Sequence, residues 1–446
     1  MDEITLRAIE NFNEHWKNGK VAERLKENIK REKFYKILKY LDERQIISIM
    51  GLRRTGKTTI IFQIADYLIE KGVNPKDIFY FSFDEITAKN PEIIEEIIQH
   101  FLINVSKSGL NEKEKKYFLF DEIQKIEDWQ AIIKRYYDLK YNIKFIVSGS
   151  ESLAMKKSIK ESLAGRTFDF LLTPLSFKEF LMFKGFEIKE TNYKKIYAEL
   201  LSKQTKISSL FEDFLLKGGF PETLNLDIEK AQEYINDSVI QKIIFKDIPI
   251  HFKITNPEIL IKILELASKN TSQLFEIMQI SEVFNIGRNS ASLYISYLES
   301  SFLIHLSYNY TQSKVKQLRT QKKIFISDTG IANSILKQRK IDSPEYLGKL
   351  VETQIHNELS NNYETLFWRD KQQHEVDVIV KKNKINPIEI KYKTSLNSSD
   401  NKGIDFFLKK FRSNAIIVTK NIFKEENKIK YIPAWLFLLA YEGIIE

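Results

Sequence analysis

The sequence predicts an α/β protein whose N-terminal part is a parallel β-sheet with helices on both faces. Two observations lead to this prediction. Short apolar runs that end in polar residues alternate with stretches of helical periodicity, which is the pattern of parallel strands joined by crossover helices. Between the first run and its helix lies a loop with two glycines, residues 51–58, at the edge where such sheets bind ligands.

This loop is preceded by a strand and followed by a helix. Residues 45–50 are an apolar run that we expect to be buried, and apolar side chains recur at helical spacing over residues 59–70. Residues 51–58 read Gly-Leu-Arg-Arg-Thr-Gly-Lys-Thr, the G-x-x-x-x-G-K-[ST] pattern of a phosphate-binding loop. The glycines let the backbone aim N–H groups at an anion, Lys57 can reach the β- and γ-phosphates, and Thr58 can ligate Mg²⁺.

The flanking strand and helix argue against the alternative, an accidental match in a surface turn. We therefore predict that ATP and Mg²⁺ bind at this loop. The predicted nucleotide contacts are Gly51, Leu52, Arg53, Arg54, Thr55, Gly56, Lys57, Thr58 and Thr59.

Three more apolar runs are expected to be strands of the same sheet. They cover residues 79–83, 116–120 and 143–147. Because parallel strands end at one edge, the polar residues Asp121, Glu122 and Ser148 should lie near the phosphate loop. We predict that Asp121 holds Mg²⁺ and that Glu122 orients and polarises the attacking water. A pair of acids facing solvent is the alternative.

Ser148 and Arg166 are further catalytic candidates. Ser148, or alternatively Ser150, follows a strand, where either could contact the γ-phosphate or the lytic water. Arg166 closes the segment Leu-Ala-Gly-Arg at 163–166, and a guanidinium that approaches the γ-phosphate stabilises charge in the transition state. An exposed loop arginine fits the spacing equally well.

Composition limits the classes of function. The chain of 446 residues suggests about three domains. It has no cysteine, which excludes disulfides, thiolate zinc sites and a cysteine nucleophile. It has no apolar run long enough to span a bilayer and no signal-peptide pattern, so we expect a cytoplasmic location and no membrane partner. The net charge of +9 is compatible with nucleic acid.

Together these motifs resemble AAA+-type ATPases of archaea and bacteria that carry an uncharacterised C-terminal domain. The resemblance covers essentially the whole chain. It rests on the loop at 51–59 and on residues 120–124, 148–150, 163–166, 174–180 and 218–222. It implies an AAA+ fold and ATP use, places Ser148 at the sensor position and makes Arg166 an arginine-finger candidate, but it implies no pathway.

A winged helix is predicted next. Helical segments at 259–267, within 273–284 and at 289–300 precede a strand at 303–310 and the basic residues Lys314, Lys316, Arg319, Lys322 and Lys323. This is the winged-helix order, with Arg288 and Asn289 at the start of the recognition helix. We expect DNA contacts from Arg288, Asn289, Lys314, Lys316 and Arg319. A helical packing domain that binds no DNA remains the alternative.

The last part carries a second set of carboxylates. Glu389 and Lys391 are two apart on a predicted strand and share a face, and Asp377 lies on the neighbouring strand of a hairpin. The spacing resembles the PD-(D/E)XK nuclease core, in which Glu352 would match the acid on the first helix, although the proline before Asp377 is missing. Such a set can bind a divalent metal and activate water. A degenerate domain that binds nucleic acid or a partner is the alternative.

The expected organisation has five parts. They are N-terminal helices (1–44), a P-loop AAA+ ATPase core (45–173), a helical lid or linker (174–250), the winged helix (251–325) and a nuclease-like, restriction-endonuclease-like α/β domain (326–446). The leading hypothesis is an ATP-hydrolysing AAA+-type ATPase that acts on DNA. The alternative is a signalling or assembly ATPase whose C-terminal domains bind protein and are inactive. A homo-oligomer is compatible with both.

Overall fold

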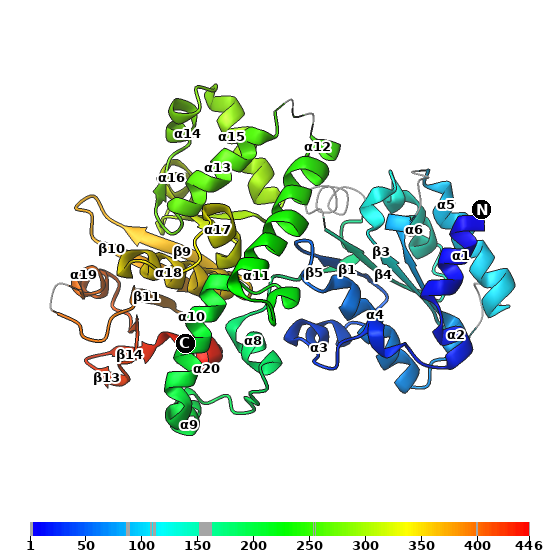
Figure 1. Ribbon diagram of the computed structural model, residues 1–446, viewed down its shortest axis with the longest axis horizontal. Coiled ribbons are helices and arrows are strands. Elements are labelled where there is room, and N and C mark those ends of the chain that lie inside the picture. The colour runs from blue at the N-terminus through cyan, green and yellow to red at the C-terminus, as the bar shows by residue number, and fades with distance from the viewer. Residues whose placement is uncertain are drawn as a thin grey trace. The chain divides into compact units, whose positions relative to one another are not determined.

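The computed structural model describes residues 3–85, 90–107, 109, 113–150, 163–252, 254, 256–397 and 400–445 (Figure 1). The chain forms two compact units, Met1–Thr173 and Pro174–Glu446.

The first unit is built on a parallel sheet of five strands in the order β2-β3-β4-β1-β5. The strands are β1 (Ile46–Met50), β2 (Ile78–Ser82), β3 (Lys116–Asp121), β4 (Ile143–Gly149) and β5 (Thr167–Leu171). The parallel sheet expected from the sequence is confirmed. Strand β5 was not expected, because polar and half-exposed residues interrupt its apolar pattern.

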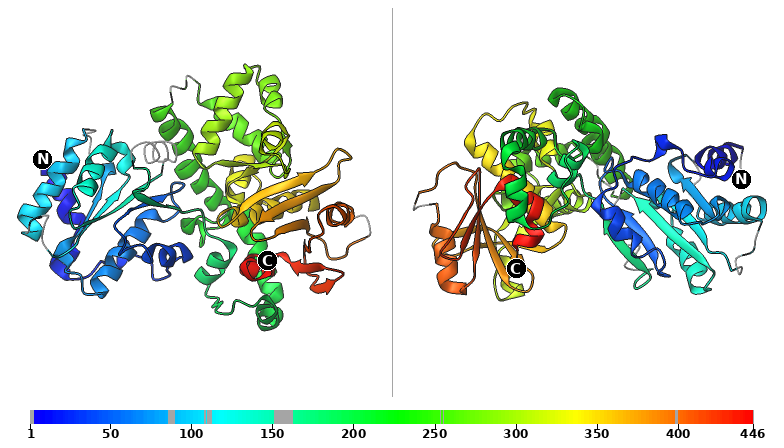
Figure 2. Two further views of the ribbon diagram at one scale, coloured as in Figure 1. Left: turned by 180° about the vertical axis from the view of Figure 1, so that it is seen from behind. Right: turned by 90° about the horizontal axis from the view of Figure 1, so that it is seen from below.

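Alternating side chains give this sheet two different apolar faces. Ile47, Ile49 and their neighbours pack with the helices α3 (Glu32–Leu38) and α4 (Lys57–Glu70). The opposite face is rich in phenylalanine, and its rings contact residues of the α5–η4 segment and of α6, as in the pair Phe118 and Phe101, 5.3 Å apart. Here α5 spans Glu92–His100, η4 spans Phe101–Ser106 and α6 spans Trp129–Asp138. Figure 2 shows helices on both faces of the sheet.

The N-terminal helices cover the β2 edge of the sheet. They are α1 (Glu3–Phe12), α2 (His15–Asn18) and the short turn η1 (Glu23–Leu25). The Asn13 side chain donates to the Tyr80 carbonyl and accepts from the Tyr80 N–H, both at 2.8 Å. Trp16 Nε1 donates to the Ile78 carbonyl at 2.8 Å. Side chains thus satisfy backbone groups that an open edge strand would expose.

The second unit begins with helices and contains a small antiparallel sheet. The helices are α8 (Phe177–Phe183), α9 (Tyr193–Leu200), α10 (Gln204–Lys217), α11 (Ile228–Ile235) and α12 (Ile248–His251), with π-helical turns at Asn236–Ile240 and Ile243–Asp247. Next come α13 (Glu258–Lys269), β6 (Leu274–Phe275), α14 (Ile277–Val283), α15 (Arg288–Ser300), β7 (Ile304–Tyr308), α16 (Lys314–Arg319) and β8 (Lys322–Ile326). The three strands pair in the order β6-β8-β7.

A mixed sheet of six strands follows α17 (Thr329–Leu336) and α18 (Pro344–Ser360). Its strands are β9 (Glu364–Arg369), β10 (Glu375–Lys381), β11 (Ile385–Lys391), β12 (Ala415–Thr419), β13 (Lys424–Glu426) and β14 (Ile429–Pro433), in the order β13-β14-β12-β11-β10-β9. One face packs in a core with α18 and α20 (Ala434–Ile444), and the other packs with α19 (Lys402–Phe411).

The Gly218-Gly219 turn fits closely against the start of α17. Gly218 has φ +75°, and a Cβ there would overlap the Asp328 carboxylate. The Gly219 and Gly330 N–H groups each donate to Asp328 at 2.8 Å, and the Gly219 carbonyl accepts from Leu175 N at 2.7 Å. Gly218 is therefore required by its close approach to the Asp328 carboxylate, and Gly219 by its close approach to the Leu175 backbone.

Candidate functional site

The phosphate loop leaves the carboxyl end of β1 and enters α4, as predicted. A Cβ at Gly51 would overlap the Leu172 carbonyl just beyond β5, so this position needs glycine. Gly56 has φ +90° and immediately precedes α4, and Arg54 has φ +64°. The Thr55 hydroxyl donates to the Leu52 carbonyl at 2.9 Å, which fixes the turn. The loop therefore leads the backbone to a helix N-terminus, where an anion is favoured.

Lys57 lies inside the curve of this loop. Its ammonium donates to the Gly51 and Leu52 carbonyls at 3.1 and 2.9 Å, and its side chain is buried. Arg31, which the sequence did not indicate, supports the loop from outside. Its guanidinium donates to the carbonyls of Thr55 and Thr173, both at 2.9 Å. In the sequence Arg31 is one of many charged residues before the first strand, so no pattern distinguished it.

Asp121 and Thr58 meet at the edge of the sheet. The Thr58 hydroxyl donates to Asp121 Oδ2 at 2.5 Å, the Tyr80 hydroxyl donates to the same oxygen at 3.2 Å, and the Ser148 hydroxyl donates to Oδ1. Burial raises the pKa of Asp121, and the neighbouring charge of Glu122 raises it further. A hydroxyl and a carboxylate side by side form the hard-oxygen donor set that Mg²⁺ prefers.

Glu122 is held beside this pair by two polar side chains. Gln124 Nε2 donates to Glu122 Oε2 at 2.6 Å and the Ser150 hydroxyl donates to the same oxygen at 2.9 Å. Glu122 itself has φ +52°, an unfavourable backbone region that tends to occur at functional sites. Burial acts to raise the pKa of Glu122, but Lys57 and the two donors outweigh it and lower the pKa. Glu122 is therefore ionised at neutral pH and can accept a proton.

The structure places the other predicted residues differently. Ser148 donates to Asp121 at the carboxyl ends of the strands. Arg166 instead lies at the amino ends of the strands, before β5. Its neighbour Thr167 pairs with Ile46 at the start of β1, about 15 Å of strand away from the loop. The Arg166 guanidinium is paired with Asp138 at 2.9 Å. Within one chain Arg166 is therefore far from the phosphate loop, and its role as an arginine finger stays a prediction.

The predicted nuclease residues come together in the second unit around a lysine. Lys391 Nζ donates to Glu389 Oε1 at 2.5 Å, and Asp377 Oδ2 accepts from the Ile390 N–H at 2.8 Å. Lys323 Nζ lies 2.8 Å from Glu352 Oε1 and 3.5 Å from Asp377 Oδ1. We grouped Lys323 with a basic stretch, and the structure places it on β8 with its side chain only 3% exposed.

Burial shifts the acids of this cluster strongly. Burial and the charge of Asp377 raise the pKa of Glu389 to about 8, although Lys391 acts against them. Burial also raises the pKa of Glu352 to about 7, although Lys323 lowers it in part. Glu389 Oε2 has no hydrogen-bond partner among the described residues. In the part of the chain that the structure describes, no three His, Asp or Glu side chains are arranged to hold a metal ion.

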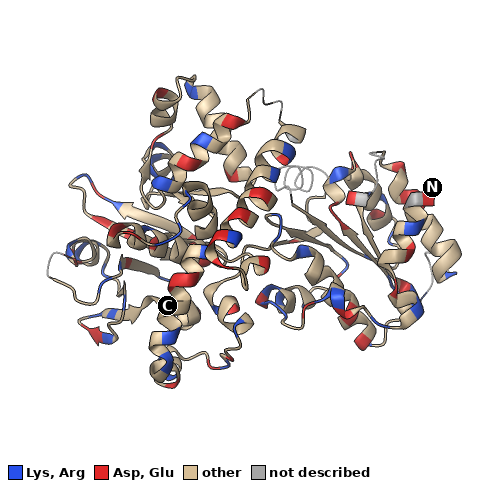
Figure 3. Ribbon diagram, in the orientation of Figure 1, with Lys and Arg blue, Asp and Glu red and all other residues tan. Residues whose placement is uncertain are grey.

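The predicted DNA contacts are exposed in the second unit. Arg288 and Asn289 begin α15, and Lys314, Lys316 and Arg319 lie on α16, a helix where we expected only a basic stretch. Along both units basic and acidic residues are interspersed (Figure 3).

A cavity of about 1020 Å³ adjoins α16. Its lining includes the amides of Asn309 and Gln372 and the cations Lys316, Lys371 and Lys410.

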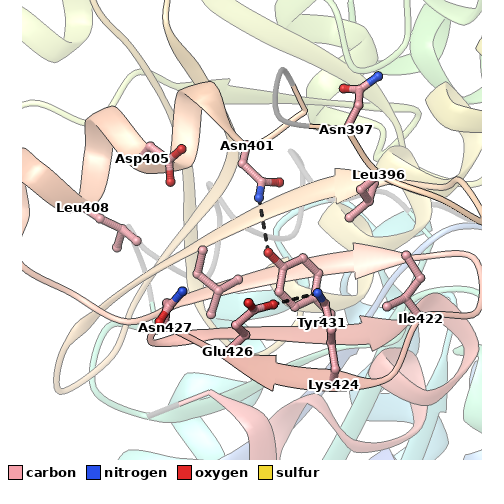
Figure 4. A pocket seen from close by; sticks show the side chains of 11 residues that line it. Leu396, Asn397, Asn401, Asp405, Leu408, Ile422, Lys424, Glu426, Asn427 and Tyr431 are labelled. Atoms are coloured by element: carbon pink, nitrogen blue, oxygen red, sulfur yellow. Dashed lines mark hydrogen bonds and ion pairs between the residues drawn. The ribbon is translucent and has the colours of Figure 1, made fainter.

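A second cavity, of about 640 Å³, lies between α19 and the β13–β14 hairpin (Figure 4). Lys424 Nζ pairs there with Glu426 at 2.7 Å, and Asn401 Nδ2 donates to the Tyr431 hydroxyl at 3.2 Å. The charges of Lys424 and Glu426 in this cavity therefore neutralise each other.

Comparison with known families gives three matches along the chain. The AAA domain model matches residues 43–181. Two domains of unknown function follow, DUF8612 at residues 208–342 and DUF4143 at residues 347–437. In the described residues, no helix is both long and apolar enough to cross a membrane.

Similar proteins occur in bacteria and archaea. An uncharacterized protein of Haemophilus influenzae is 25% identical over 332 residues, which cover 72% of this chain and 77% of that protein. An uncharacterized protein of Methanocaldococcus jannaschii is 26% identical over 411 residues, 88% of each chain.

Among solved structures, C. elegans PCH-2 matches 44% of this chain and 63% of its own, with 13% identity and a TM-score of 0.25. AMPPCP-bound DnaA from Aquifex aeolicus matches 60% of this chain and 85% of its own, with 17% identity and a TM-score of 0.24. The match of residues 43–181 to the AAA domain model supports an ATP-binding ATPase.

Proposed function

We propose that the first unit hydrolyses ATP with Mg²⁺ at the edge formed by the phosphate loop and β3. The observation that carries this proposal is that Thr58, Asp121 and Glu122 lie side by side next to Lys57. When bound, Mg²⁺ would neutralise charge on the β- and γ-phosphates, with Thr58 and Asp121 as its protein ligands.

The residues of the chain then have separate tasks. The loop N–H groups and Lys57, which now donates to loop carbonyls, would bind the phosphates. Ionised Glu122 would accept a proton from the attacking water, and Gln124 and Ser150 fix the direction of its carboxylate. Ser148 would position Asp121 through its hydroxyl.

The substitution Glu122→Gln tests this assignment. It keeps the shape of the side chain but removes the base, so we expect ATP affinity within about threefold of the original and a fall in turnover of about 10²–10⁴-fold. Glu127→Gln, an exposed acid a few residues later, is the matched control and should change neither. Turnover that is equal in both variants would remove Glu122 from the mechanism.

A second proposal concerns the other unit, which we propose contacts DNA. The elements α13 to β8, which we interpret as a winged helix, support it, as do the exposed cations of α16 and the adjoining cavity. We keep the proposed ranges of a lid at 174–250, a winged helix at 251–325 and a nuclease-like fold at 326–446. The competing possibility is that these domains bind a protein, or a second copy of the chain.

Salt dependence separates the two possibilities. Replacing Lys314, Lys316 and Arg319 together by alanine should lower the slope of log affinity against log salt by about 2.7, if each cation contacts one phosphate. The control replaces Lys17, Lys71 and Lys76 of the first unit, which are also exposed, and removes the same charge. An equal change in both variants would show that only net charge matters. No binding at low salt would leave protein contact as the better proposal.

A further inference from the structure

Lys323 is a buried lysine that reaches from one sheet of the second unit to the other. It lies on β8, where it pairs with Leu274 of β6 and Ser307 of β7. Its ammonium contacts Glu352 of α18 at 2.8 Å and, on β10, Glu375 at 2.7 Å and Asp377 at 3.5 Å. Three carboxylates from two elements therefore converge on one cation that belongs to the three-stranded sheet.

The other charges nearby already have their own partners. Lys391 pairs with Glu389 at 2.5 Å, and Arg369 pairs with Glu375 at 2.7 Å. Among the described residues, Lys323 is the cation in direct ion-pair contact with both Glu352 and Asp377, and Lys391 attracts the same two carboxylates from a longer distance. An ammonium has three N–H donors, which matches the three carboxylates around it. The side chain is 3% exposed and its strand is paired on both sides, so it cannot leave the cluster unless β8 shifts.

A divalent metal would require the same oxygen atoms. Mg²⁺ binds carboxylate oxygens at about 2.0–2.1 Å, and an ammonium hydrogen-bonded to those oxygens would lie next to it as a second buried cation. The residues present therefore do not fit the metal that the nuclease resemblance implies. Glu389 Oε2 has no hydrogen-bond partner among the described residues, so the exclusion applies to Glu352 and Asp377, which Lys323 contacts, and not to Glu389.

We infer that Lys323 is the resident cation of this acidic cluster and excludes a divalent metal from Glu352 and Asp377 as long as β8 is in place. The C-terminal fold then serves as a platform joined to the three-stranded sheet through a buried ionic contact, not as a metal-dependent nuclease. This inference is independent of the proposed ATPase and of DNA binding.

Mn²⁺ binding to the full chain without nucleotide tests the inference, with free Mn²⁺ followed by electron paramagnetic resonance. Every protein carries Asp121→Asn, which removes the carboxylate of the first unit from the measurement. With Lys323 intact, adding Asp377→Asn should leave Mn²⁺ binding unchanged. Lys323→Ala should create a site for one Mn²⁺ whose affinity is at least tenfold higher than any Mn²⁺ binding by the protein with Lys323. Adding Asp377→Asn should remove this site. Lys322→Ala, the neighbour on β8, is the matched control and should gain no site.

Two results would overturn the inference. One is a Mn²⁺ site in the protein with Lys323 that disappears with Asp377→Asn. The other is a folded Lys323→Ala protein that gains no site. If Lys323→Ala does not fold, the test compares Mn²⁺ binding by the two proteins that keep Lys323, one with Asp377 and one with Asp377→Asn. Equal Mn²⁺ binding supports the inference, and weaker binding after the substitution contradicts it. Mn²⁺-dependent DNA cleavage that requires both Lys323 and Asp377 would equally contradict it.

Discussion

Asp328 should be one of the most sensitive positions of the second unit. Its buried carboxylate accepts from the N–H groups of Gly219 and Gly330, both at 2.8 Å. Asp328→Ala leaves both donors buried without an acceptor, and each such group costs about 1–3 kcal/mol. We therefore expect the local free energy of unfolding to fall by about 4 kcal/mol, which combines two such losses. Asp328→Asn keeps one acceptor oxygen and should lose about half as much.

The same carboxylate predicts a dependence on pH. Burial raises the pKa of Asp328 from 3.8 to about 6, although the backbone N–H groups act against it. Between these values the unfolded chain has released the proton and the folded chain still holds it. The contribution of Asp328 to the free energy of unfolding should therefore fall as pH rises from 4 to 6 and level off above pH 6. The loss over this range amounts to about 3 kcal/mol.

Hydrogen exchange measured by mass spectrometry can test both expectations. Peptides that cover 214–222 and 328–336 should lose protection in Asp328→Ala but not in Asp213→Ala, a control in which a partly exposed aspartate paired with Lys217 is removed. Thermal unfolding measured from pH 4.5 to 7 should show that stability falls less steeply with pH in Asp328→Asn than in the unsubstituted protein. Equal protection in the two alanine variants, together with an unchanged slope, would refute the reasoning.

Three shorter predictions concern the first unit. Gly51→Ala should abolish detectable ATP binding, measured by calorimetry, because its Cβ would overlap the Leu172 carbonyl; unchanged affinity would contradict this placement. Arg31→Ala removes two charged hydrogen bonds to backbone carbonyls and should weaken ATP binding by about tenfold, or about 1.4 kcal/mol, whereas equal affinity would show that the loop needs no such support. Arg166→Ala should leave turnover in a dilute, monomeric preparation unchanged, and a tenfold loss there would restore Arg166 as a finger acting within one chain.

The sequence was most informative where one chemical task fixes several residues in a row. The phosphate loop and Asp121-Glu122 were identified because a glycine turn, a lysine, a hydroxyl and strand-end acids must occur at set spacings. The parallel sheet then brought Asp121 to Thr58, since all its strands end at one edge.

Contacts made by distant segments left no such pattern. Arg166 looked like a finger because the order of residues does not show at which end of β5 it lies. In the sequence Lys323 is one member of a basic stretch, and only the meeting of β8 with α18 and β10 reveals its carboxylate partners. Arg31 supports the loop through two hydrogen bonds to backbone carbonyls, and Gln124 positions Glu122 through one, and any polar donor in the right place could make such bonds.

The residues after β5 touch the phosphate loop at both of its ends. Gly51 lies against the Leu172 carbonyl, and Arg31 joins the Thr55 carbonyl to that of Thr173. Thr173 is also the last residue of the first unit. A nucleotide bound at the loop would therefore lie only a few bonds from the point where the chain leaves the unit.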